Sequence, residues 1–261
     1  MENVGMDNKS LHFQPFNNTL LECMKDQDQK QYELFPYYDE LLNSTVLDKM
    51  VLDNLISRCI LMIEDREEII KPATQNERNK VLLDILTKRP YGTLNVFKEV
   101  LKESDPYNTD VQELVSRMQC IESYDESISC HDIIFHEHIV KLQKNYTKFV
   151  HDVESKTDIA DYLYENSVLN DEEKEEVCSC SITRHDSNRI LYSKLFRKGE
   201  DAFKHLLKAL RHGKYEDIAF DIENTKVSEH EIQLLQIGMK RLQEREKERG
   251  KPKRLEIFQV S

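Results

Sequence analysis

An internal repeat constrains the fold of this 261-residue chain more than any other feature of its sequence. Residues 61–69 align without a gap on residues 169–177, with acidic, basic and apolar positions in the same order. After one inserted residue the match resumes, and positions within 74–86 fall on their counterparts within 183–195. A repeat of this kind indicates one structural unit that is built twice. We therefore expect two copies of one small domain.

Apolar residues in both copies recur at helical spacing. In the first copy Thr74 and Glu77 form a capping box that starts a helix. One apolar stripe follows on that helix: Val81, Leu82, Ile85 and Leu86. The chain has 6 Gly and 6 Pro, too few for a turn-rich β-sandwich or a glycine-looped nucleotide fold. The prediction is an all-α protein with two antiparallel six-helix bundles, each with its own core, and a C-terminal helix.

Breaks in the helical spacing and shifts in composition divide the chain into five parts. They are a disordered N-terminal tail (1–29), a first bundle (30–118), a linker (119–134), a second bundle (135–225) and a C-terminal helix with a basic tail (226–261). The second bundle is expected to open with one long amphipathic helix over residues 139–153. A capping box of Ser228 and Glu231 is expected to start the C-terminal helix.

Neither a membrane span nor a signal peptide is expected. The longest apolar run, residues 59–63, is far shorter than the roughly 20 residues that a membrane-spanning helix needs. The first residues lack the basic and apolar regions of a leader. The predicted location is cytoplasmic, where thiols are kept reduced. A formal net charge of −12 opposes binding to nucleic acid or an anionic membrane and favours basic partners.

The chain shows no catalytic motif. It has no glycine-rich phosphate loop, no Gly-x-Ser-x-Gly elbow and no His-Glu-x-x-His helix, so we expect no enzyme activity and no cofactor. Two groups of side chains are conceivable zinc ligands: Cys178 and Cys180 with His185, and Cys120, Cys130, His131, His136 and His138. Neither group has the paired spacing of a structural zinc site. Unpaired thiols and no metal are predicted.

Three segments of the first copy, residues 55–69, 74–89 and 94–104, together resemble the caspase recruitment domain (CARD). That family has an acidic Glu-Asp-x-Glu-x-Ile helix, here residues 64–69, followed by a Lys-Val-Leu-Leu-Asp-Ile-Leu helix, here residues 80–86. The second copy looks like a more diverged member. The resemblance implies two death-fold bundles in tandem, which bind other such domains homotypically and need no cofactor.

Acidic clusters recur in both copies, and basic residues lie on the helices that follow. The acidic positions are Glu64, Asp65, Glu67 and Glu68 in the first copy and Asp171, Glu172, Glu173, Glu175 and Glu176 in the second. The basic positions are Arg78, Lys80, Arg89, Arg184 and Arg189. The resemblance implies that acidic and basic faces bind each other, although solvated polar faces would give the same pattern. On the binding hypothesis, Asp65→Lys or Arg78→Glu abolishes assembly and leaves stability nearly unchanged.

The function implied by the resemblance is that of a non-enzymatic adaptor in apoptotic or innate-immune signalling. Its expected partners are other CARD proteins, such as initiator caspases or signalling scaffolds, and further copies of itself; no nucleic acid or membrane is expected. Two alternatives stay open. The chain could be a structural oligomer built through a C-terminal coiled coil, or a detached regulatory prodomain of a larger signalling protein.

Overall fold

The computed structural model describes residues 34–44, 49–89, 93–118 and 137–249. These ranges consist of helices and connecting turns, with no strand among them, so the all-α prediction is confirmed. The predicted N-terminal tail and the predicted linker lie outside the described residues, as does the chain after residue 249.

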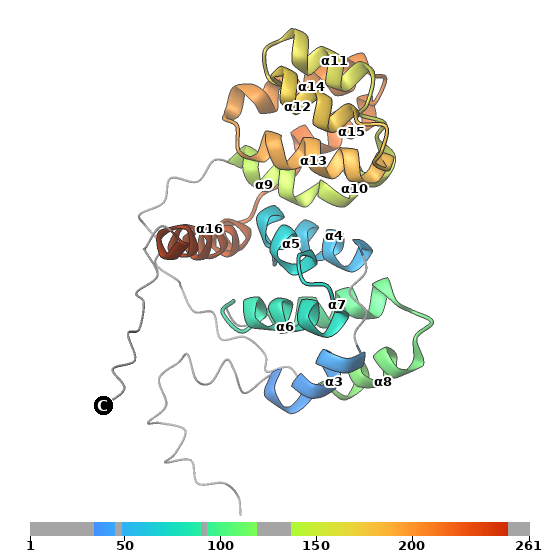
Figure 1. Cartoon of the computed structure of the whole chain (residues 1–261), viewed down its shortest axis with the longest axis vertical. Helices are drawn as coiled ribbons and strands as arrows, with labels where there is room; N and C mark the ends of the chain where they lie inside the picture. Colours follow the sequence, from blue (N-terminus) through green and yellow to red (C-terminus); the bar gives the residue numbers. More distant parts are fainter. Residues whose placement is uncertain (1–33, 45–48, 90–92, 119–136, 250–261) are drawn as a thin grey trace, which may run out of the picture.

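Two helical bundles and one further helix make up the described chain. The first bundle contains η1 (Phe35–Tyr37), α3 (Tyr38–Ser44), α4 (Lys49–Ser57), α5 (Ile63–Ile70), α6 (Gln75–Leu86), α7 (Thr93–Ser104) and α8 (Thr109–Arg117). The second contains α9 (Glu137–Lys144), α10 (Tyr146–Asp152), α11 (Asp158–Glu165), α12 (Asp171–Cys178), α13 (Arg184–Phe196), α14 (Glu200–His212) and α15 (Glu216–Asn224). The bundles follow one another along the long axis of the molecule, and α16 (Glu229–Arg249) lies beside the level where they meet (Figure 1).

The long helix predicted over residues 139–153 is broken at Asn145 into α9 and α10, so the prediction of one uninterrupted helix is wrong. Asn145 has a ψ of 9°, which departs from helical geometry. Its side-chain amide donates to the carbonyl oxygen of Lys141 at 2.8 Å and to the hydroxyl of Thr225 at 2.7 Å. These bonds tie the break to the end of α15.

The sequence repeat extends to the backbone of the turn between α4 and α5 and of its counterpart between α11 and α12. Cys59 and Ser167, 108 positions apart, both have a positive φ, 60° and 57°. The two amides after each of them donate to one carbonyl oxygen, that of Leu55 in the first copy and that of Leu163 in the second. The same turn therefore directs α5 and α12 away from the helices before them.

Helix caps repeat in the same way. The Asp65 carboxylate accepts from the Met62 amide at 2.9 Å at the start of α5, and the Glu173 carboxylate accepts from the Asn170 amide at 3.0 Å at the start of α12. The predicted cap at Thr74 and its counterpart at Thr183 are also present: the Thr74 hydroxyl accepts from the Glu77 amide, and the Thr183 hydroxyl accepts from the Asp186 amide. Such caps satisfy amides that a helix start leaves unpaired.

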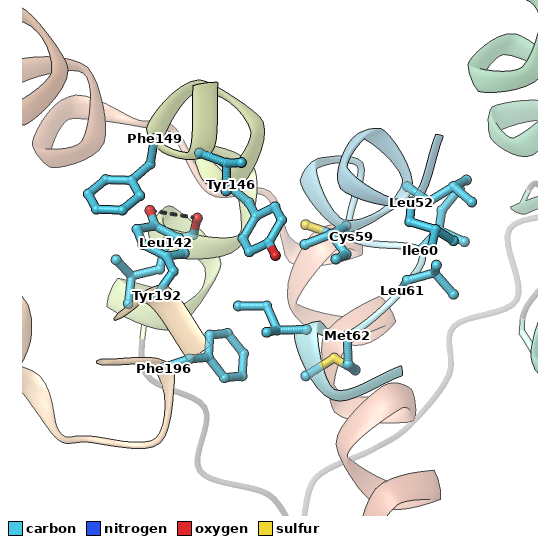
Figure 2. Packing of buried hydrophobic residues seen from close by; sticks show 14 of the residues in the cluster. Leu52, Cys59, Ile60, Leu61, Met62, Leu142, Tyr146, Phe149, Tyr192 and Phe196 are labelled. Atoms are coloured by element: carbon cyan, nitrogen blue, oxygen red, sulfur yellow. Dashed lines mark hydrogen bonds between the residues drawn. The ribbon is translucent and has the colours of Figure 1, made fainter. Parts of the chain in front are cut away.

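One hydrophobic core joins the two bundles, so the expectation of two separate cores is wrong. Buried apolar residues of both copies form a single contiguous cluster. Figure 2 shows Tyr146 of α10 between Tyr192 of its own bundle and Cys59 of the first bundle. The turn that carries Cys59 and Met62 is apolar and almost fully buried, so the first bundle cannot expose it without losing hydrophobic burial.

Candidate protein-binding faces

An acid–base pair joins α4 to α5 in the first copy and α11 to α12 in the second. Arg66 Nε of α5 lies 3.5 Å from Asp53 Oδ1 of α4, and Lys174 Nζ of α12 lies 2.8 Å from Asp161 Oδ1 of α11. Each partner of the second pair stands 108 positions after its counterpart. The Asp53 side chain is fully buried, whereas that of Asp161 is 56% exposed. We call these equivalent surfaces, on α4 and α5 and on α11 and α12, face A of each copy.

The second bundle closes face A of the first copy with Arg189 of α13. The Arg189 Nε–H lies 3.2 Å from both carboxylate oxygens of Asp53, and Nη2 donates to Oδ2 at 2.5 Å. His151 Nε2 of α10 lies 3.5 Å from the same carboxylate. Asp53 therefore holds two arginines, one from each bundle, in a site where an unpaired charge would be strongly unfavourable.

Hydrogen bonds around Asp53 complete the junction between the copies. Gln143 of α9 donates to the carbonyl oxygen of Ile56 at 3.0 Å, and the Thr147 hydroxyl of α10 donates to that of Asp53 at 2.9 Å. At the edge, Lys49 Nζ lies 2.8 Å from Asp186 Oδ1. We call the surface on α10 and α13 that carries Thr147, Asp186 and Arg189, together with its counterpart on α3 and α6, face B.

The last part of the junction is acidic on one side and basic on the other. Arg197 at the end of α13 lies 3.7 Å from Glu64 and 3.8 Å from Glu67, both on α5. Burial raises the pKa of Glu64, and the charge of Arg197 opposes that rise. Within the chain, face A of the first copy thus contributes mainly acids and face B of the second copy mainly bases, with the edge pair of Lys49 and Asp186 in the reverse sense.

The ion pair of Lys49 and Asp186 makes a pH-dependent contribution to the stability of this junction. Partial burial would raise the pKa of Asp186, but hydrogen bonds from Lys49 and Thr183 and the charge of Arg189 outweigh it and lower the pKa to about 2. Because the folded pKa lies below the ordinary 3.8, the stabilisation is present above 3.8 and is lost as the pH falls toward 2.

Removing this pair is expected to have an effect that disappears in acid. Wild type and Asp186→Asn should differ in their free energy of unfolding at neutral pH, and the difference should vanish as the pH falls from about 4 to about 2. Denaturant unfolding across that range measures it, and Lys49→Met should show the same window. A difference that persists at the acid end would contradict this assignment.

Face A of the second copy is open. Glu172 and Glu175 of α12 are the counterparts of Glu64 and Glu67, and both are exposed. Neither forms an ion pair with another residue in the described ranges, and no second bundle covers Asp161 beside them. This surface presents the acids that the first copy uses in the junction.

Face B of the first copy is open as well. Lys80 of α6 is the counterpart of Arg189, and Lys88, just after α6, is the counterpart of Arg197, each 109 positions earlier. Both lysines are exposed, and neither pairs with an acid among the described residues. The two open faces lie on different bundles, face A on the upper bundle of Figure 1 and face B on the lower one.

Three of the predicted binding residues are buried and paired inside the chain, so their assignment to an exposed binding face is wrong. Asp65 is fully buried and its Oδ2 accepts from Arg89 Nη2 at 2.8 Å; Arg89 itself is 3% exposed. Arg189 is 6% exposed and binds Asp53. Helix periodicity does not reveal these contacts, because each needs a partner from another part of the fold.

The remaining predicted residues differ in how far they are engaged. Arg78 Nε donates to the carbonyl oxygen of Pro72 at 2.7 Å, and exposed Arg184 donates to that of His151 at 2.7 Å. The other acids of α12 have partners in the second bundle: Asp171 with Tyr164, Glu173 with Lys198 and Glu176 with Lys194. Glu68 pairs with α16.

Sequence reasoning missed Asp53, Asp161, Lys88 and Arg197. The repeat contained the signal for all four, because shifts of 108 or 109 positions align Asp53 with Asp161 and Lys88 with Arg197. The acidic run drew attention to α5 and α12, whereas Asp53 is the one acidic residue of α4.

The described cysteines are Cys59, Cys178 and Cys180, and none of them forms a disulfide with another described residue. Burial raises the pKa of the Cys59 thiol to about 12. In the described ranges no three His, Cys, Asp or Glu side chains gather as metal ligands would. None of the described helices combines the length and the apolar character needed to cross a bilayer.

A duplicated helical bundle whose copies dock through complementary faces defines a tandem protein-interaction module. The family model of the caspase recruitment domain matches the chain twice, over residues 39–115 and 140–225. The chain therefore belongs to the CARD family and carries two such domains in tandem, as predicted. Comparison with curated proteins and with solved structures gave no match. CARDs bind other CARD-containing proteins and are generally not enzymes.

Proposed function

We propose that this chain is a non-enzymatic tandem-CARD adaptor, which assembles with CARDs of other chains through the two faces left open. The observation that carries the proposal is the junction itself. There, face A of one copy binds face B of the other through Asp53, Arg189 and Arg197. Their counterparts on the open faces carry the same charges. Asp161 on face A is acidic like Asp53, and Lys80 on face B is basic like Arg189.

The position of the two open faces favours an assembly of chains that grows in one direction. A contact between face A of one chain and face B of the next is heterologous, and such contacts propagate when they do not close into a ring. Complementary charge mainly sets specificity and encounter rate, so apolar neighbours must supply part of the affinity. At the internal junction Ile63, Ile70 and Ile190 line the groove beside Arg189 and supply such apolar surface.

CARDs of initiator caspases or of signalling scaffolds fit the same scheme as partners in apoptotic or innate-immune signalling. An acidic face A would select a CARD with a basic surface, and a basic face B one with an acidic surface. Such an adaptor would act in the cytoplasm. The coiled-coil alternative is less well supported, because Leu235 is fully buried in this chain's own core and Met239 and Leu242 pack against that core.

Charge reversal on either open face is expected to stop assembly. Glu172→Lys with Glu175→Lys removes the acids of face A, and Lys80→Glu with Lys88→Glu removes the bases of face B. Each double variant should weaken self-association by at least about 100-fold, since like charges would face each other across the contact. Sedimentation velocity over a range of concentrations measures this, with Lys102→Glu plus Lys208→Glu as an exposed control pair.

Mixing the two double variants gives a sharper test. Each face of one variant meets a face of opposite charge on the other, so the mixture should recover assembly with the two chains alternating, although neither variant assembles alone. A chain that carries all four reversals should recover assembly with itself. If all these proteins sediment like wild type, face A and face B do not mediate association and the proposal fails.

A further inference from the structure

Helix α16 bridges the two bundles and is anchored by its first half. Leu235 is fully buried and Leu234 is 6% exposed. Glu231 pairs with Lys144 of α9 at 2.6 Å, which fixes the start of the helix to the second bundle. A Cβ at Gly238 would lie 2.7 Å from atoms of Met62 and Arg89. Up to Gly238, therefore, α16 packs closely against both bundles.

Charge holds the second half of α16 to the first bundle. Arg241 pairs with Asp65 and Glu68, and Arg245 pairs with Glu68, both acids being on α5. An open groove of about 600 Å³ separates the two helices beside these pairs, with Leu242 of α16 on its wall. Met239 and Leu242 are only partly buried against the core here, so much of the contact depends on ion pairs, which salt weakens.

The second half of α16 can leave α5 without creating an unpaired buried charge. Asp65 is fully buried, but it keeps Arg89 Nη2 at 2.8 Å and the Met62 amide at 2.9 Å when Arg241 is absent. The Glu68 side chain is 27% exposed and can be solvated. Detachment of the second half therefore does not carry the penalty of an uncompensated buried ion.

The same surface in the second copy lacks this cover. Glu173 and Glu176 of α12 are the counterparts of Asp65 and Glu68, and their partners are Lys198 and Lys194 from the same bundle. The Glu176 side chain is 56% exposed, and its partner Lys194 comes from α13 of the same bundle, whereas Glu68 pairs with arginines of α16. The chain thus covers this acidic surface in one copy and leaves it open in the other.

We propose that the second half of α16, from Met239 onward, is a detachable strap that closes the acidic surface of α5 to basic helices of other chains. Detachment exposes Glu68 and the outer oxygen of Asp65, while Leu234 and Leu235 keep the helix tethered. The released surface fits a basic amphipathic helix with the spacing of Arg241 and Arg245. This device is additional to faces A and B of the proposed function and does not depend on them.

Neutralising the two arginines tests the strap in the full chain. Arg241→Gln with Arg245→Gln should speed amide hydrogen exchange in residues 240–247 by about tenfold and leave residues 232–236 unchanged, given the modest energy of partly exposed pairs. Lys240→Gln with Lys247→Gln is the matched control, because it removes the same charge from exposed, unpaired positions of the same helix. High salt should open the strap of the wild-type chain in the same way.

A labelled peptide of residues 229–249 tests whether the released surface binds a basic helix. By fluorescence anisotropy it should bind the Arg241→Gln/Arg245→Gln chain about tenfold more tightly than wild type or the control. Exchange in 240–247 that matches the control, or an opened chain that does not bind the peptide, would overturn the proposal. Both measurements use chains too dilute to assemble, so they are independent of faces A and B.

Discussion

Replacing Asp53 with asparagine is expected to lower the free energy of unfolding of the chain by about 3–5 kcal/mol, because it breaks a buried ion pair by removing one partner. Arg66 and Arg189 are 8% and 6% exposed. Arg66 would keep a buried charge without its carboxylate, and Arg189 would keep only its pair with Asp186 at 3.0 Å. Asparagine preserves the shape of the side chain, which confines the change to charge. Urea unfolding followed by helical circular dichroism measures the loss.

Asp161→Asn is the matched control for Asp53→Asn. It removes the equivalent carboxylate from the second copy, where the side chain is 56% exposed and pairs with Lys174. An exposed pair contributes about 0–1 kcal/mol, so this variant should unfold almost like wild type. Similar losses in the two variants would contradict the assignment of Asp53 as the buried centre of the junction.

Much of the fold could be predicted because the signals are local. The caps at Thr74 and Thr183 lie within four residues of the amides that they satisfy. The repeat imposed a shared helix order, and the structure extends it to the turns at Cys59 and Ser167. These features depend on backbone geometry and nearby side chains, which a sequence pattern records directly.

Contacts between distant segments were not predictable in this way. Asp65 and Glu68 face α16, whereas Glu64 and Glu67 face Arg197, although all four stand in one run of five residues. The run showed that α5 is acidic but not which acids would be buried. The shared core was missed for the same reason, since Tyr146 and Cys59 join one buried cluster only when the bundles dock.

The copies also show how one ancestral position can take two roles. Arg189 is buried against Asp53, whereas its counterpart Lys80 is exposed. An arginine suits the buried site because its planar guanidinium can donate to both carboxylate oxygens, and a lysine suits a solvated one. A given position therefore lies in the junction or on an open face according to which of the two copies carries it.

Asp65→Lys is expected to have the largest effect of any substitution considered for this chain. The new ammonium would be buried beside Arg89 and Arg241, so three positive charges would meet where one carboxylate now compensates two guanidiniums. Loss of at least about 5 kcal/mol follows from uncompensated buried charge, enough to unfold many small domains. The sequence-based expectation that this variant keeps its stability is therefore incompatible with the burial of Asp65.

The repeat again supplies the control, because Glu173 occupies the equivalent position in α12. Its side chain is 19% exposed, its partner Lys198 is 30% exposed, and α16 does not cover it. Water can reach both groups, so Glu173→Lys should lose about 1–2 kcal/mol, well below the loss for Asp65→Lys. Thermal and urea unfolding of the two variants side by side decide the question. If Asp65→Lys folds as well as Glu173→Lys, the buried network of Asp65, Arg89 and Arg241 does not hold α5 in place, and the attachment of the second half of α16 through Arg241 fails as well.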